Sequence, residues 1–81
     1  MTTKQPPATP AEMVVQVRAE MARQRITLPQ LADRLGVPYP TLYGRFANAD
    51  RRLLYRDLAQ IAEALGVPLA TLEARAEGRA A

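Results

Sequence analysis

The segment Leu-Gly-Val-Pro-x-x-Thr-Leu occurs twice in this chain, at residues 35–42 (LGVPYPTL) and 65–72 (LGVPLATL). In each copy a glycine follows an amphipathic segment, and glycine is the residue that most easily adopts the left-handed conformation that ends a helix. The proline two residues later cannot continue the preceding helix and favours the start of a new segment. The repeat therefore predicts two tight connections between helices within one short chain.

Amphipathic patterns on both sides of these turns predict helices through most of the chain. The clearest pattern lies in residues 54–65, whose apolar side chains fall on one helical face. The first two helices carry start signals, because Thr9 and Glu12, like Thr27 and Gln30, have the spacing of a capping box. We predict an all-α fold of five helices, at residues 10–25, 28–35, 40–47, 54–65 and 69–77.

The remaining segments are short and polar, and a length of 81 residues allows one small domain with a single core. The first nine residues are polar and proline-rich, so we predict a disordered arm at 1–9. The domain follows at 10–77, with a frayed C-terminus at 78–81. Residues 48–52 are predicted to form a loop, in which Asp50 could cap the next helix.

Several side chains on which enzymes and metal sites depend are missing. The sequence has no cysteine, histidine or serine, which removes the commonest metal ligands, the usual general base and the usual hydroxyl nucleophile. The eight Asp and Glu residues are scattered singly among arginines, so no catalytic carboxylate pair is indicated. We therefore expect no enzymatic activity, no metal, no cofactor and no small-molecule ligand.

The charge balance favours a different class of partner. The chain has a net charge of +3 and an isoelectric point near 10.0, and its basic residues are almost all arginines. An isoelectric point above about 9 is one mark of a nucleic-acid-binding domain. No apolar segment approaches the length of a membrane span, and the N-terminal residues lack the apolar stretch of a signal peptide. We expect a cytoplasmic protein without a membrane partner.

The predicted helix at 40–47 has an unusual outward surface. We expect Tyr39 to be its non-helical entry, because Pro40 disfavours the helical conformation in the preceding residue. On a helical wheel Leu42 and Phe46 face the core, and Tyr43 and Arg45 stand on the two flanks. The positions that point away from the core carry small side chains: Pro40, Thr41, Gly44 and Ala47.

Two features of this helix have both a functional and a purely structural explanation. Glycine within a helix costs about 1 kcal/mol relative to alanine, so Gly44 indicates either close approach to a groove wall or simple tolerance in a short helix. Tyr39 and Tyr43 either contact a ligand or cover the edge of the small core, and the two roles are compatible. Thr41, outward and β-branched at the helix start, gains little for folding, which favours a contact role.

Arginines gather in the sequence around this helix. Because they would flank it in a compact arrangement, we expect them to contact the two backbones of a DNA duplex. The alternative is a solvated face on which they pair with Asp33, Asp50 and Asp57. The residues concerned are Arg34, Arg45, Arg51, Arg52 and Arg56.

The segment TLPQLADRLGVPYPTLYGRFAN resembles the helix-turn-helix of the lambda-repressor and Cro-like family. The family pattern has Ser or Thr, then Leu-Ala, Leu-Gly-Val, and an apolar residue five after the valine. The resemblance covers about residues 12–77 and implies a compact five-helix, lambda-repressor-like DNA-binding domain whose helix-turn-helix is formed by the second and third helices. The matching residues are Thr27, Leu31, Ala32, Leu35, Gly36, Val37, Leu42 and Phe46.

By this resemblance the helix at 40–47 is a recognition helix in the major groove. The implied base or groove contacts come from Tyr39, Pro40, Thr41, Tyr43 and Gly44, together with Arg45. The implied contacts to the DNA backbone come from Asn48, Arg51 and Arg52, to which the charge pattern adds Arg34 and Arg56.

Three positions depart from the family pattern. Leu28 stands where members often have glutamine, and Pro38 stands where the recognition helix usually has a Ser or Thr cap. The outward positions lack glutamine, asparagine and arginine, so the usual bidentate base contacts are not available there. We expect readout to depend on thymine methyl contacts, Arg45 and DNA shape.

The resemblance implies a sequence-specific, double-stranded DNA-binding transcription regulator of phage or prokaryotic type, in the bacterial cytoplasm or nucleoid. It also implies a homodimer on two half-sites, with the helix at 69–77 as the dimer element, unless Leu69 and Leu72 only close the core. The alternative function is a small helical interaction module, an antitoxin or adaptor, that binds an acidic protein.

Overall fold

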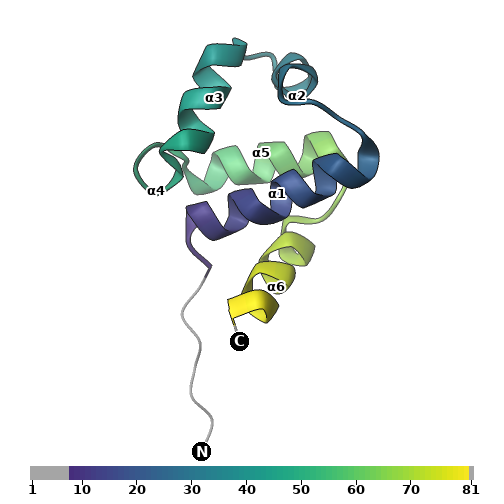
Figure 1. Cartoon of the computed structure of the whole chain (residues 1–81), viewed down its shortest axis with the longest axis vertical. Coiled ribbons are helices and arrows are strands. Elements are labelled where there is room, and N and C mark those ends of the chain that lie inside the picture. Colours follow the sequence, from purple (N-terminus) through teal and green to yellow (C-terminus); the bar gives the residue numbers. More distant parts are fainter. Residues whose placement is uncertain (1–7, 81) are drawn as a thin grey trace, which may run out of the picture.

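The computed structural model describes residues 8–80, and this part of the chain is helical with no strand (Figure 1). The predicted all-α fold is confirmed, with six helices in place of the expected five. Their bounds are α1 Pro10–Gln24, α2 Leu28–Leu35, α3 Tyr39–Ala47, α4 Ala49–Arg52, α5 Tyr55–Leu65 and α6 Leu69–Ala80.

The predicted start signals of α1 and α2 are present as complete capping boxes. The Thr9 hydroxyl accepts a hydrogen bond from the Glu12 amide at 3.2 Å, and the Glu12 carboxylate accepts one from the Thr9 amide at 2.7 Å. Thr27 and Gln30 repeat this exchange at 3.3 and 2.8 Å. Both helices therefore begin where local chemistry satisfies their free amides.

Both copies of the repeat adopt the same turn. Gly36 and Gly66 have φ angles of 71° and 73°, in the left-handed region that favours glycine. The following valine amides donate back to the helices, from Val37 to the Ala32 carbonyl and from Val67 to the Ala62 carbonyl, each at 3.1 Å. These bonds are those of a Schellman motif, which ends α2 and α5 sharply.

The segment predicted as a loop at 48–52 is instead a one-turn helix, α4. The Asn48 carbonyl accepts from the amide of Arg52 at 2.8 Å, and Ala49 is buried at 5% exposure. Asp50 does not cap α5: its carboxylate accepts from the Ala11 amide at 3.0 Å, which attaches α4 to the start of α1. The prediction failed because this partner lies 39 residues away in the sequence.

Two further helix ends differ from expectation. Helix α3 begins at Tyr39, not Pro40, because Pro38 already provides the extended entry, with ψ of 142°. Pro40 then occupies the second position, where its missing N–H costs no helical bond. α6 continues to Ala80 past the expected end at Glu77, since the alanines and arginine around Gly78 favour a helix. The predicted arm falls largely on residues 1–7, outside the described range.

Helices α1 and α5 lie side by side across the middle of the molecule, and the core is centred on them. Helices α2 and α3 lie at one end and α6 at the other (Figure 1). Leu72 of α6 has no exposed surface, and Leu31, Leu42 and Ile61 are at most 1% exposed. Leu72, the last residue of the second repeat, therefore closes the core of the monomer. Of the two roles that the sequence left open for Leu72, dimer contact or core residue, this is the second.

The polar side of α1 is partly covered by α6. Glu20 is only 8% exposed, and its carboxylate accepts hydrogen bonds from Arg23, Gln24 and Arg75. The bond from Gln24, followed by those from Arg75 and Arg23, lowers the pKa of Glu20 to about 2 despite the opposing effect of burial. The sequence pattern missed this because Arg75 comes from α6; Gln16 is buried likewise.

Candidate nucleic-acid interface

Helix α3 stands at the end of the molecule opposite α6 and packs on α2 and α4 (Figure 1). Leu42 and Phe46 are 1% and 5% exposed, so the predicted core face of this helix is confirmed. Phe46 also lies beneath the Arg18 guanidinium of α1, 5.4 Å from the ring centroid. Helix α3 is thus held by the core on one side, and its exposed side is available for contact.

The exposed side of α3 carries an aromatic pair. Tyr39 and Tyr43 are 43% and 54% exposed, one helical turn apart, with ring centroids separated by 6.0 Å and planes tilted by 54°. Mutual packing limits the movement of both rings. Their exposure leaves much of each ring free for contact, so covering the core is not their whole role. Pro40 beside them is exposed, and Thr41 is half-buried.

The space outside Gly44 is filled by a side chain of the same protein, that of Arg52. A methyl group built at Gly44 would lie 3.0 Å from Nη1 of Arg52, closer than ordinary van der Waals contact. Arg52 comes from α4 and reaches back over α3. The sequence left open whether Gly44 allows close approach to a groove wall or is merely tolerated in a short helix; in this structure the group beside it is the Arg52 guanidinium.

Arg45 lies on the opposite flank from the tyrosines, near the start of α5. Its Nη1 is 3.8 Å from the Asp57 carboxylate. The same carboxylate accepts a hydrogen bond from the Leu54 amide at 2.9 Å and so caps α5. Arg45 is therefore partly paired with Asp57 within the fold. For this residue, the structure agrees with the alternative of a solvated face on which arginines pair with aspartates.

The other residues expected to contact backbone follow α3 directly. Arg51, Arg52 and Arg56 are exposed and have no ion pair within the part of the chain that the structure describes. Asn48 is also exposed, but its side-chain amide donates to the Gly44 carbonyl at 3.1 Å, at the end of α3. Three guanidinium groups without an ion pair among the described residues thus lie on α4 and the first turn of α5, close to α3 in the sequence.

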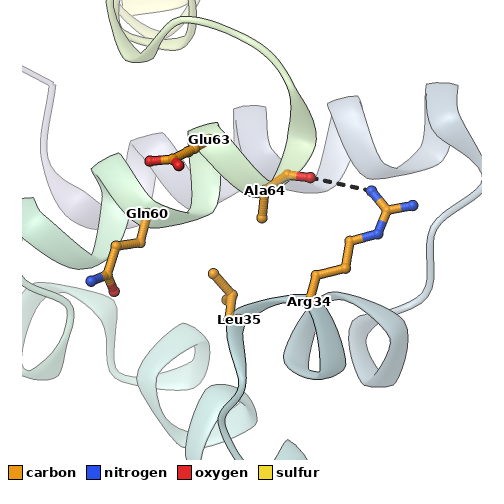
Figure 2. Close-up of a pocket in the computed structure, with 5 residues that line it drawn as sticks. All are labelled: Arg34, Leu35, Gln60, Glu63 and Ala64. Carbon is orange, nitrogen blue, oxygen red and sulfur yellow. Dashed lines mark hydrogen bonds between the residues drawn. The ribbon is translucent and has the colours of Figure 1, made fainter.

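Arg34 is not part of this cluster. Its guanidinium donates to the Ala64 carbonyl at 3.2 Å, near the end of α5 (Figure 2). Arg56 lies in the first turn of the same helix, eight residues and about 12 Å earlier. Arg34 instead borders a shallow groove of about 430 Å³, with Leu35, Gln60 and Glu63.

A second surface that the sequence pattern did not single out lies at the start of α5. Tyr55 and Leu54 are 66% and 50% exposed, the first being the most exposed of the large apolar side chains. Tyr55 and Leu58 help to line an adjoining hollow of about 220 Å³. The remaining lining residues are Ala8, Pro10, Met13, Leu69 and Glu73.

Within residues 8–80, no helix is long and apolar enough to cross a membrane. The same residues contain no cluster of three or more acidic side chains that could hold a metal ion. The described residues thus show neither feature, and the arginine-flanked α3 remains the most distinctive surface.

Comparison with known proteins is consistent with this geometry. Residues 17–72, most of the folded part of the chain, match a family model described as Helix-turn-helix. No curated protein and no solved structure matches the chain. The matched range includes α2, the Gly36 turn and α3, the three elements that form the helix-turn-helix unit. The chain therefore belongs to the lambda-repressor/Cro-like helix-turn-helix family of DNA-binding domains.

Proposed function

We propose that this protein is a sequence-specific transcription regulator of repressor or Cro-like type, from a phage or a prokaryote, that inserts α3 into the major groove of double-stranded DNA. The observation that carries the proposal is the surface of α3, where an exposed tyrosine pair lies beside three unpaired arginines. Residues 10–77 act as the DNA-binding domain, with the bacterial cytoplasm or nucleoid as its location. No catalytic step or cofactor is part of this function.

Base and groove contacts come from the exposed side of α3. The rings of Tyr39 and Tyr43 present apolar edges, which suit the methyl groups of thymine, and their hydroxyls can reach base edges or phosphates. Pro40 and Thr41 complete the surface at the start of the helix. Gly44, which has no side chain, lets the middle of the helix approach the groove closely. Arg45 contributes at the far flank, where its pairing with Asp57 limits its reach.

Contacts to the DNA backbone come from the segment after α3. Arg51 and Arg56 are exposed and free of ion pairs among the described residues, and Asn48 lies at the junction between α3 and α4. Guanidinium groups suit phosphate because they donate two parallel hydrogen bonds. Arg34 is a more distant backbone contact, since it must release the Ala64 carbonyl before it can reach DNA.

The protein binds its site as a homodimer. Leu72 is buried in the monomer, so we infer that the dimer surface comprises Leu54, Tyr55, Leu69 and the hollow beside them. A projecting tyrosine and a hollow on one surface suit a two-fold contact, in which each copy offers both parts to the other. The second copy also supplies the second recognition helix that two half-sites require.

The dimer surface is tested by sedimentation of Tyr55→Asp and Tyr43→Asp, two matched changes of exposed tyrosines. A charge at Tyr55 should make the protein a monomer at concentrations where the parent is a dimer. The same charge at Tyr43 should leave the dimer intact and weaken DNA binding. A parent protein that remains monomeric even on its DNA site would refute the proposed dimer.

The function itself is tested by selection of bound duplexes from a random DNA library. A palindromic consensus would support DNA binding, sequence preference and two-fold symmetry together. Failure to enrich any sequence, combined with capture by an acidic protein surface that random duplex does not compete for, would favour a protein-interaction module instead. A salt titration adds a second readout, because each neutralised phosphate contributes a log-log slope of about −0.9.

A further inference from the structure

The outward surface of α3 has no long polar side chain of its own at its centre. Tyr39 and Pro40 stand at its start and Gly44 at its middle, so the centre of this surface has no amide or guanidinium group of the kind that usually reads bases; the one guanidinium of α3, Arg45, lies on its flank. The guanidinium of Arg52 lies against this surface, with its Nη1 3.0 Å from the position of a methyl group at Gly44. A residue outside the recognition helix thus supplies the missing chemical group.

The position of Arg52 is set by its place on α4. Residues three and four apart share a helical face, and on α4 this face includes Ala49, Arg52 and the following Leu53. Ala49 and Leu53 are 5% and 4% exposed, so both anchor that face against the fold. Arg52 is therefore directed toward the middle of α3 at Gly44, whereas Arg51 borders a hollow at the end of α3, beside Ala47.

We propose that Arg52 reads a guanine in the major groove, and does not simply contact phosphate as its place in the sequence suggested. The inference rests on the proposed function, because it requires α3 to enter the groove. A guanidinium can donate two hydrogen bonds to O6 and N7 of guanine, the commonest specific contact in protein–DNA complexes. Arg45 is less suited to this role, since Asp57 holds it at the other flank.

Gly44 is then explained by Arg52. A methyl group at position 44 would lie 3.0 Å from Nη1 of Arg52, so the guanidinium would have to move by a few tenths of an ångström. Because alanine is a better helix former than glycine, Gly44→Ala should fold at least as well as the parent protein. It should nevertheless weaken the guanine preference, since its methyl group forces the Arg52 side chain to shift.

The experiment compares Arg52→Ala, Arg52→Lys and the neighbouring control Arg51→Ala on the selected DNA site. Circular dichroism first establishes that each variant is folded. Arg52→Ala should lose about 10- to 100-fold of preference at one G·C pair and keep its affinity for random duplex. Arg52→Lys should retain only part of the preference, because an ammonium is a point donor. Arg51→Ala should weaken all duplexes alike and reduce the salt slope by about 0.9.

A change in the DNA isolates the contact. Replacing the guanine by 7-deazaguanine removes N7, and should weaken binding by the parent protein but not by Arg52→Ala. If Arg52→Ala lowers affinity equally for all duplexes, Arg52 is a phosphate contact and the inference is wrong, while the proposed function stands. If the parent protein shows no sequence preference, the proposed function fails, and this inference fails with it.

Discussion

The buried carboxylate of Glu20 should make the stability of this protein depend on acid in a specific way. Glu20 accepts hydrogen bonds from Gln24 and Arg23 on its own helix and from Arg75 of α6, the last at 2.9 Å. It therefore connects two helices that are far apart in the sequence. Glu20→Gln keeps the size of the side chain and removes its charge, so that it mimics the protonated acid.

The magnitude follows from the pKa. The Gln24, Arg75 and Arg23 hydrogen bonds lower the pKa of Glu20 from 4.5 to about 2. Full conversion at 1.36 kcal/mol for each pKa unit gives about 3 kcal/mol. The arginine partners are 53% and 41% exposed, so solvent screening reduces this value. We expect Glu20→Gln to lower the free energy of unfolding by about 1–2 kcal/mol at pH 7.

The free energy of unfolding should fall as the pH is lowered, because the pKa of Glu20 is lower in the folded state than in the unfolded state. The charged carboxylate stabilises the fold fully above pH 4.5, and this contribution is lost as the pH falls toward 2. Urea unfolding of the parent and Glu20→Gln should therefore differ at pH 7 and nearly coincide near pH 2. Glu63→Gln, an exposed change of the same kind, is the control. A difference between parent and Glu20→Gln that is the same at both pH values would refute the role of the charge.

Two further predictions concern the core and the recognition surface. Leu72→Ala should lower the free energy of unfolding by about 2–5 kcal/mol, because its side chain is fully buried, whereas Val15→Ala, 45% exposed, should change it by less than about 0.5 kcal/mol in the same urea titration. Thr41→Ala combined with Tyr43→Ala should remove the preference at the base pairs that these side chains contact, while keeping the guanine preference assigned to Arg52 and the binding to random duplex, as measured by competition; an unchanged preference would exclude these residues from base readout.

Local chemistry explains why much of the fold could be predicted. The capping boxes of α1 and α2 and the glycine turns at Gly36 and Gly66 each involve residues within a few positions of one another. Their hydrogen bonds are therefore decided by short segments of sequence. The core face of α3 was predictable for the same reason, because helical periodicity alone places Leu42 and Phe46 on one side.

The contacts that were missed are those made across the fold. Glu20 meets Arg75 across 55 residues, Asp50 meets the Ala11 amide across 39, and Arg34 meets the Ala64 carbonyl across 30. None of these pairings could be predicted from the sequence, because no periodic pattern records what packs against a polar side chain. The candidate site shows the same limit, since the sequence left the role of Gly44 open and did not indicate that Arg52 lies beside it.

The two copies of the repeat have similar sequences and the same turn, but their surroundings in the fold differ. Their turns are alike in φ and in hydrogen bonds, but the helices that follow have different neighbours. α6 packs on α1 and α5, which buries Leu72, and its Glu73 and Glu77 would repel phosphate. α3 keeps an exposed tyrosine pair and a free arginine beside it. The proposed DNA-reading surface therefore requires both the turn and a helix after it with an exposed face, and of the two copies the first combines them.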